Sequence, residues 1–380
     1  MTNETETGKG TVQARRALWA SFAFYVLIAF EFFYMASPFA AYFYAVYGPG
    51  LDWLQASGPA SWIIQFFMPH LVEETRSVLI DIHELVGMIL LTGGLAGFAI
   101  GVIQIYRAKL RRDDAVMGGL YRHIRHPQYL ALIVASIGML LIWPRYLVLV
   151  LTVTVIFIYI ALAKAEEGIC LRQFPGYADY MKRTGMFLPE WFNLNVSLRF
   201  GDSQLKRFAG WALTYAIVLG LALLAAFGLR VLSMNALYTY QGDEGIYLSI
   251  VEIADEDLAA VAATARSAPE VQAILSGKTH LLNYVVPTEM YIAEIPMYLP
   301  PGETFGHSVP YDRNPALYKV VFTEAVFGGE GLPAGGDILW NAVNKIPLVE
   351  AHVDLRGKAA VTALPPPTEP FYGNRQVPLF

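Results

Sequence analysis

Long apolar runs constrain this chain more than any other feature. They cover residues 18–47, 79–106, 129–142, 146–163 and 208–234, and polar or aromatic loops separate them. A helix rises 1.5 Å per residue, so about 20 residues cross a hydrocarbon core of about 30 Å. The composition, 55% hydrophobic and 16% charged, agrees with membrane segments joined to a soluble part. The runs therefore predict a polytopic all-α membrane domain over residues 1–234, with about five transmembrane helices.

Two of the runs are expected to form a helical hairpin. The run 129–142 is short and ends at Trp143-Pro144-Arg145, after which 146–163 is apolar again. Proline is disfavoured inside helices, so the chain should turn here and return to the membrane face it came from. This return would bring Glu166 to the level of His126.

The distribution of lysine and arginine predicts the orientation of the spans. Basic residues concentrate in segments 107–126 and 164–207, whereas the opposite loops hold little beyond Arg76 and Arg145. Loops that remain in the cytoplasm carry an excess of Lys and Arg, so both basic segments and the N-terminus should be cytoplasmic. The first run lacks a convincing cleavage site for a signal peptide. We expect an integral protein of a bacterial inner membrane, with residues 235–380 on the extracytoplasmic side.

Residues 235–380 form a different kind of sequence. They contain no spanning run, and their patterns predict a helix at 256–265 and short strands at 281–286, 318–323, 348–354 and 359–363. Pro-Pro-Gly at 300–302 marks a loop, and Pro-Pro-Pro at 365–367 opens a Pro-rich tail. We expect a small α+β domain. It could bind a protein partner, cap the membrane domain, or be purely structural.

Basic groups cluster directly before the third apolar run. Arg122, His123, Arg125 and His126 precede Pro127, a residue suited to the first turn of a helix. A helix that starts there would direct its positive dipole end towards an anion. Glu166 and Glu167 follow the next run, where a helix C-terminus disfavours carboxylates and calls for a cation. An anion site and a cation site on one membrane face suit a zwitterionic ligand.

The stretch from about 118 to 189 resembles the isoprenylcysteine carboxyl methyltransferase and phospholipid methyltransferase family. The resemblance is carried by Arg125-His126-Pro127-Gln128-Tyr129, the Glu166-Glu167 pair, Tyr177, Tyr180, Arg183 and Pro189. It implies binding of S-adenosylmethionine by Arg125, His126, Tyr129, Glu166, Glu167, Tyr177, Tyr180 and Arg183. The chain departs from the family pattern at Ala131, where members usually carry glycine. Its spacing from the glutamates to the tyrosines is also one residue shorter than in the prenylcysteine enzymes.

The resemblance also implies a reaction. The enzyme would transfer a methyl group to a membrane lipid or other apolar acceptor that enters from the bilayer, with Lys164 and Glu166 as catalytic candidates. Arg125 and the helix beginning at Pro127 would hold the cofactor carboxylate, and Glu166 or Glu167 its ammonium. A prenylcysteine carboxylate, a lipid amine and a small thiol remain open as acceptors.

Two other classes of function stay open at this stage. An NADPH-dependent sterol-type reductase would also use cytoplasmic arginines, but the Glu166-Glu167 pair disfavours a phosphate-rich cofactor. A non-catalytic subunit of a larger complex would tolerate Ala131 and an appended outer domain. The basic residues could also be only a positive-inside flank, and the tyrosines only interfacial residues. The net charge of −5 gives no indication of a nucleic-acid partner.

A second group of ionisable residues lies in and before the second apolar run. It comprises His70, Glu74, Asp81, His83 and Glu84, with Glu31 in the first run. Ionisable residues in membrane segments are functional candidates, so a metal or quinone site is conceivable. No complete ligand motif is present, and we expect these residues to pair with one another and stabilise packing rather than bind a metal. The single cysteine, Cys170, excludes an internal disulfide.

Overall fold

A computed structural model describes most of the chain. The described residues are 62–111, 118–192, 203–328, 331–367, Leu379, and scattered positions between 19 and 54. The described part divides into two compact units. Unit 1 comprises Met1–Pro49, Ile89–Gly138 and Leu151–Tyr215; unit 2 comprises Gly50–Met88, Met139–Val150 and Ala216–Phe380.

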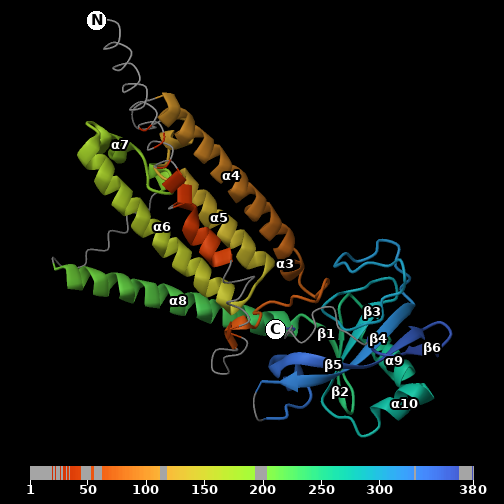
Figure 1. The fold of residues 1–380 in the computed structure, drawn as a ribbon. Helices are drawn as coiled ribbons and strands as arrows, with labels where there is room; N and C mark the ends of the chain where they lie inside the picture. The colour runs from red at the N-terminus through yellow and green to blue at the C-terminus, as the bar shows by residue number, and fades with distance from the viewer. Residues whose placement is uncertain are drawn as a thin grey trace, which may run out of the picture. The chain divides into compact units, whose positions relative to one another are not determined.

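Helices dominate the first part of the chain (Figure 1). They are α3 Val78–Asp81, α4 His83–Arg111, α5 Pro127–Ile142, α6 Tyr146–Gln173, α7 Tyr177–Arg183 and α8 Gln204–Asn235. Three stretches are long and apolar enough to cross a membrane, namely Val78–Leu110, Tyr146–Gln173 and Gln204–Asn235. The predicted long apolar helices are thereby confirmed. The count of five stays a prediction, because much of the run 18–47 lies outside the described residues and α5 is shorter than the three spans.

The predicted helical hairpin is present. Helix α5 begins at Pro127 and ends at Ile142, and α6 begins at Tyr146. In the turn between them, the Arg145 N–H donates to the Trp143 carbonyl at 2.7 Å. Tyr129 of α5 lies against Tyr159 of α6, with ring centroids 5.0 Å apart. The contact places the start of α5 beside the middle of α6.

Glycines let α4 approach α5 closely. A Cβ on Gly94 would lie 2.6 Å from the backbone oxygen of Ala131, and one on Gly101 would lie 2.9 Å from Gln128. Gly97 faces Ala131 more loosely, at 3.5 Å. A Cβ on Gly93, one position before Gly94, would meet nothing within 4 Å. One residue turns a helix by about 100°, which moves Gly93 off the contact face.

Unit 2 contains a six-stranded sheet in the order β1-β2-β3-β4-β5-β6. Its strands are β1 Tyr238–Gln241, β2 Gly245–Ser249, β3 Leu281–Pro287, β4 Leu317–Phe327, β5 Ala342–Asp354 and β6 Ala359–Leu364. Strands β2 and β3 pair in parallel, and the other neighbours pair antiparallel. The parallel pair requires a crossover, which α9 Asp255–Ser267 and α10 Pro269–Leu275 provide. The predicted helix and the four predicted strands are confirmed, whereas β1, β2, α10 and α11 Asp337–Asn341 were missed.

The segment before α3 is part of the core of unit 2. Leu71 and Val72 pack into the same buried cluster as the strands. The Glu73 N–H donates to the Ile250 carbonyl at 2.9 Å, and the Arg76 N–H donates to the Ala236 carbonyl at 2.8 Å. Unit 2 is therefore assembled from segments far apart in the sequence.

Candidate functional site

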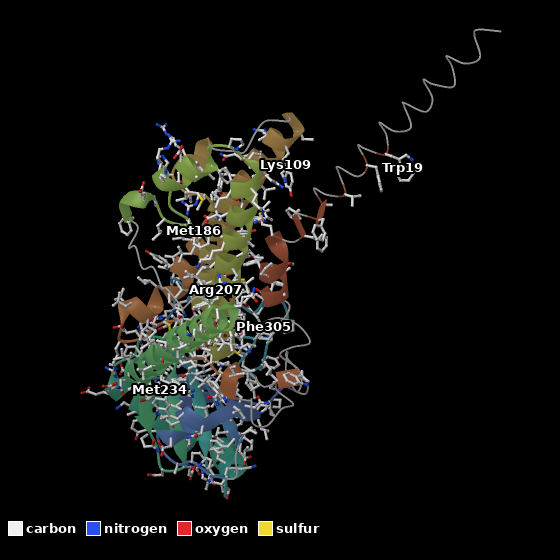
Figure 2. The ribbon with its side chains drawn as sticks, turned by 90° about the vertical axis from the view of Figure 1, so that its left-hand side faces the viewer. Trp19, Lys109, Met186, Arg207, Met234 and Phe305 are labelled. Carbon is white, nitrogen blue, oxygen red and sulfur yellow. The ribbon has the colours of Figure 1, made fainter. Side chains whose placement is uncertain are left out.

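The loop before α5 is fixed by the chain that follows α7. Ile124 forms a parallel bridge with Gly185, and the N–H groups of Arg125 and His126 donate to the carbonyls of Gly185 and Met186 at 2.9 and 3.1 Å. A Cβ at Gly185 would lie only 1.7 Å from the Leu188 carbonyl oxygen, so a larger residue does not fit. Figure 2 draws the side chains on the ribbon and labels Lys109 near the end of α4 and Met186 after α7. Tight backbone pairing therefore sets where the Arg125-His126 motif lies.

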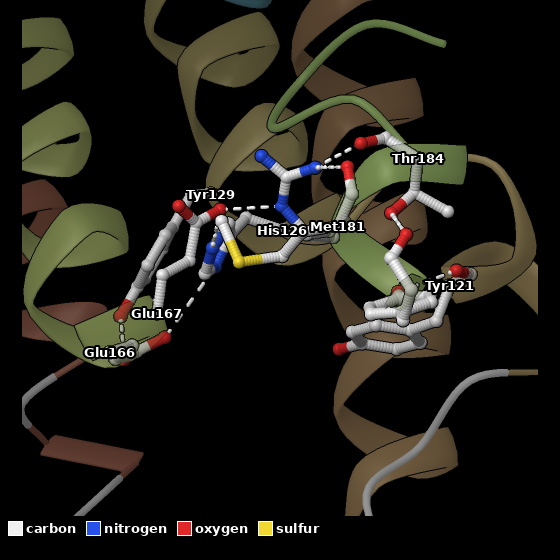
Figure 3. A network of polar contacts seen from close by, with 9 residues as sticks. Tyr121, His126, Tyr129, Glu166, Glu167, Met181 and Thr184 are labelled. Atoms are coloured by element: carbon white, nitrogen blue, oxygen red, sulfur yellow. Dashed lines mark hydrogen bonds and ion pairs between the residues drawn. The ribbon is translucent and has the colours of Figure 1, made fainter. Parts of the chain in front are cut away.

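Tyr180 of α7 provides a second attachment. Its hydroxyl donates to the Tyr121 carbonyl at 2.6 Å, in the short 3-10 helix Gly119–Arg122 (Figure 3). Burial raises the pKa of Tyr180 to about 12, so the hydroxyl keeps its proton at neutral pH. The Thr184 hydroxyl in turn donates to the Tyr180 carbonyl at 2.7 Å. Tyr180 thus attaches α7 to the segment before α5 and contacts the backbone there.

Arg125 forms a buried ion pair with Glu167. Its Nε lies 2.6 Å from Glu167 Oε1, and the two side chains are 9% and 8% exposed. Its Nη1 donates to the Met181 carbonyl at 3.1 Å and to the Thr184 carbonyl. The guanidinium therefore joins α6 to the C-terminal end of α7, where a cation is favoured by the helix dipole.

His126 lies between the two glutamates. Its Nε2 is 3.3 Å from Glu167 Oε1, and its Nδ1 is 3.5 Å from Glu166 Oε2. Burial alone would lower the pKa of His126, but its hydrogen bonds to Glu166 and Glu167 outweigh burial and raise it. The imidazole is thus favoured as a cation that bridges both carboxylates.

Tyr129 and Glu166 complete the group. The Tyr129 hydroxyl donates to Glu166 Oε1, and the Tyr129 ring lies nearly parallel to that of His126. The two glutamates differ in exposure, since the Glu166 side chain is 38% exposed and that of Glu167 is 8% exposed. We define the charged cluster as Arg125, His126, Tyr129, Glu166 and Glu167, and Figure 3 labels the last four of these residues. The cluster presents one carboxylate to its surroundings and buries the other.

Three other predicted site residues contact groups outside the charged cluster. Lys164 directs its Nζ over the Trp211 ring, 4.0 Å from the centroid. Arg183 is exposed and donates from Nε to the Asp179 carbonyl at 3.2 Å. Tyr177 is buried, with its ring 5.5 Å from that of Tyr180. The structure thus joins five of the predicted residues directly and keeps Tyr180 as a support.

Ala131, the departure from the family pattern, points towards α4. It is 8% exposed and meets Gly94 and Gly97 there. The Ala131 methyl group lies 3.5 Å from the position that a Cβ on Gly97 would take, so the glycine of α4 accommodates it. Sequence reasoning missed Tyr121, Thr184 and Gly185 as supports. Of these, only the glycine between Thr184 and Met186 carried a signal, because glycine permits close backbone approach.

The second group of ionisable residues does not come together. Asp81 accepts from the Thr75 N–H at 2.8 Å, His83 contacts the Ile80 carbonyl, and Glu74 pairs with Arg313 at 2.8 Å. Among the described residues, no group of three or more His, Cys, Asp or Glu is placed to hold a metal ion. Glu31 lies outside the described residues.

His70 instead belongs to a set of residues that the sequence did not bring together. His307 lies 3.0 Å from Glu73 and 3.2 Å from Glu294, and His70 lies 3.8 Å from Glu294. We call these four residues the histidine network of unit 2. Hydrogen bonds to Glu294 and Glu73 raise the pKa of His307 to about 10, whereas burial lowers the pKa of His70. One imidazolium is thus held between two carboxylates.

Comparison with known proteins identifies the region that carries the charged cluster. No curated protein matches the chain, and no solved structure does. A family model described as phospholipid methyltransferase matches residues 98–175, which run from α4 to just past α6 and include the whole charged cluster. The resemblance deduced from the motifs is thereby confirmed: residues 98–175 match the phospholipid methyltransferase family.

Proposed function

We propose that this protein is an integral-membrane methyltransferase that uses S-adenosylmethionine and acts on a lipid-like or small apolar acceptor. One observation carries the proposal. Within the stretch matched by the phospholipid methyltransferase model, His126 and Arg125 at the start of α5 lie against Glu166 and Glu167 of α6. The partly exposed Glu166 gives this arrangement a face for a ligand.

The charge of the cluster suits a cationic ligand. Arg125 compensates Glu167, whereas the carboxylate of Glu166 is partly exposed and accessible to a ligand cation. S-adenosylmethionine carries an ammonium, a carboxylate and a sulfonium, and when bound it supplies an electrophilic methyl group. Glu166 is the residue we assign to its cationic part. This choice refines the sequence prediction, because Glu167 is already paired with a buried arginine.

Arg125 takes a supporting role in this proposal. Its Nε and Nη1 contact Glu167 and two carbonyls at the end of α7, so it positions the cluster rather than binding a carboxylate through these atoms. The N-terminus of α5 is the remaining candidate for the cofactor carboxylate, because its first N–H groups have no acceptor within the helix. Direct methyl displacement needs alignment and exclusion of water, which a membrane-embedded site provides.

The acceptor would reach the site through the bilayer. Helices α4 and α8 expose many apolar side chains, including Leu85, Ile89, Leu221 and Leu224. Such surfaces are what lipid-facing helices present. A lipid amine, a prenylcysteine carboxylate and a small thiol remain candidate acceptors. Lys164 stays a candidate for contact with the acceptor head group, since it lies near the same end of α6 as Glu166.

The orientation is part of the proposal. The basic segments around the charged cluster support a cytoplasmic position for it in a bacterial inner membrane, on the side where S-adenosylmethionine is made. Residues 235–380 would then form an extracytoplasmic domain that is free to bind a protein partner. A reporter fused after Phe380 should behave as extracytoplasmic, and a reporter near Arg112 as cytoplasmic. Both reporters on one side would contradict this topology.

The proposed cofactor is tested by binding to the detergent-purified full chain. We expect saturable binding of S-adenosylmethionine and no binding of NADPH. Binding of NADPH alone would instead favour the reductase, and binding of neither would favour a non-catalytic subunit. A Glu166→Gln variant serves as the matched control, because it removes the exposed charge while keeping the shape of the side chain.

A further inference from the structure

We propose that Tyr129 is a positioning residue that orients Glu166, and that it does not itself contact the methyl donor. The inference rests on the proposed function and assigns a different role to one of its residues. Tyr129 could contact the ligand directly or act on it only through Glu166. The packing of its ring and the partner of its hydroxyl favour the second role.

The Tyr129 side chain has almost no surface left for a ligand. The residue is 2% exposed. The His126 ring lies against it at 5.6 Å and 9°, and the Tyr159 ring at 5.0 Å and 22°. These three near-parallel rings run from the loop before α5 into the middle of α6, and they fix the direction in which the Tyr129 hydroxyl points. A sulfonium could not reach the face of a ring packed in this way.

The hydroxyl is directed at the one exposed acid of the cluster. It donates to Glu166 Oε1, while His126 Nδ1 lies 3.5 Å from Glu166 Oε2. Each carboxylate oxygen can accept more than one hydrogen bond, so both oxygens can still receive a donor from a ligand. Because Glu166 is 38% exposed, it would otherwise sample several rotamers. Tyr129 and His126 together restrict it before any ligand arrives, which lowers the entropy cost of binding.

If Tyr129 acts only through Glu166, the effects of substituting the two residues on ligand binding should not add. The dissociation constant of S-adenosylmethionine is measured for the full chain in detergent, for the unsubstituted protein, Tyr129→Phe, Glu166→Gln and the double variant. Loss of the hydrogen bond that orders Glu166 should weaken binding about fivefold in Tyr129→Phe, and loss of the charge should weaken it more in Glu166→Gln. The double variant should match Glu166→Gln within about twofold, because Tyr129 acts only through Glu166. Effects that multiply would mean that Tyr129 meets the ligand directly, and would overturn the inference.

A matched control removes a tyrosine hydroxyl elsewhere in unit 1. The Tyr215 hydroxyl is 2.9 Å from Thr154 Oγ1, at the contact of α8 with α6. Tyr215→Phe should leave the dissociation constant unchanged. A change as large as that of Tyr129→Phe would show that any lost hydroxyl in this helix pair disturbs the site, and the positioning role would then be rejected.

A ligand-free measurement separates this inference from the proposed function. The infrared C–O stretching band of Tyr129 depends on the acceptor of its hydroxyl, and its difference spectrum is isolated by comparison with Tyr129→Phe. We expect Glu166→Gln to shift this band and Glu167→Gln to move it much less. An unshifted band would contradict the Tyr129–Glu166 contact, whether or not the protein binds S-adenosylmethionine. If the unsubstituted protein binds no S-adenosylmethionine, the proposed function is wrong. The infrared band then still tests whether the Tyr129 hydroxyl contacts Glu166.

Discussion

The charged cluster of unit 1 and the histidine network of unit 2 both contain histidine and glutamate, but a different group is exposed in each. Each contains histidine between two glutamates. In the charged cluster the outermost group is the carboxylate of Glu166, which is 38% exposed. In the histidine network the central carboxylate, Glu294, is 5% exposed, and the outermost group is the imidazole of His307. A site for a cationic ligand needs an accessible anion, so only the first arrangement is suited to one.

The charged cluster and the histidine network also differ in how far apart their residues lie in the sequence. The charged cluster comes from two short motifs on a helical hairpin, inside the stretch that matches the phospholipid methyltransferase model. The histidine network joins the segment before α3 to the loops between β3 and β4, more than 200 residues away. Its ion pairs tie these distant segments together. We therefore expect substitutions in the cluster to affect ligand binding, and substitutions in the network to affect only the stability of unit 2.

The largest effect is expected for Glu167→Gln. Both partners of the Arg125–Glu167 pair are more than nine-tenths buried, and removing one charge leaves the arginine uncompensated. Breaking a buried pair typically costs about 3–5 kcal/mol, so both the free energy of unfolding and cofactor binding should fall. Thermal unfolding and binding in detergent measure the two effects. Unchanged stability of the variant would show that another group compensates the charge of Arg125, and would contradict the prediction.

A smaller effect is expected between α4 and α5, where the packing determines how far α5 lies from its neighbours. Gly94→Ala would place a methyl group 2.6 Å from two backbone atoms of α5, and such overpacking typically costs about 1–3 kcal/mol. Gly93→Ala, one position away, meets nothing within 4 Å and should be neutral or slightly stabilising. Thermal unfolding of the two variants in parallel tests the prediction. Equal effects would contradict the observed helix contact.

Glu294→Gln tests the histidine network against the charged cluster. It removes the buried negative charge and one of the two acceptor oxygens that face His307 and His70, while Glu73 remains 3.0 Å from His307. A lost buried hydrogen bond of this kind typically costs about 1–3 kcal/mol, so unit 2 should lose stability. Binding of S-adenosylmethionine should stay unchanged, which is the opposite of the result expected for Glu166→Gln. Loss of binding in Glu294→Gln would remove the functional distinction between the two arrangements.

The smallest effect is a dependence of stability on pH, because the His307 side chain is 38% exposed and solvent screens its ion pairs. The folded pKa of both His126 and His307 is raised above the unfolded value of about 6.5. Each histidine therefore stabilises the fold fully below that value, and the contribution is lost as pH rises through the folded pKa. For His307 the loss should extend to about pH 10, and His307→Gln should flatten this part of the profile. Hydrogen exchange of the amides of residues 303–309 between pH 6 and 9, corrected for the intrinsic rate, reports it locally. A protection profile that rises with pH would contradict the sign.

The sequence predicted what depends on local pattern. The start of α5 followed from Pro127, the turn of the hairpin from Trp143-Pro144-Arg145, and the strands of unit 2 from runs of apolar and β-branched residues. Strands β1 and β2 were missed because each is short and Gly242 and Gly245 interrupt the pattern between them. Such short elements form because they pair with neighbours in the sheet.

The composition of the charged cluster was predictable, but its internal pairing was not. Arg125, His126, Tyr129, Glu166 and Glu167 were all expected in the site. The sequence assigned Arg125 to a ligand carboxylate, whereas the structure pairs it with Glu167 and with carbonyls at the end of α7. This pairing depends on the position of α7, which is set by the fit of Gly185 against Leu188 and by the Tyr180 hydroxyl on Tyr121. Contacts between segments about 60 residues apart cannot be predicted from the pattern of residues within a short window of the sequence.

Transfer of labelled methyl groups from S-adenosylmethionine tests the central claim most directly. The full chain is incubated with labelled donor, membrane lipid extracts and small thiols, beside the Glu166→Gln variant. We predict label in an apolar acceptor fraction, and a loss of about two orders of magnitude in Glu166→Gln, the size expected when a charged partner of a desolvated ligand cation is removed. Label transferred equally by the variant would show that the charged cluster is not the site. If the unsubstituted protein transfers no label to any fraction and binds no S-adenosylmethionine, the methyltransferase account is wrong.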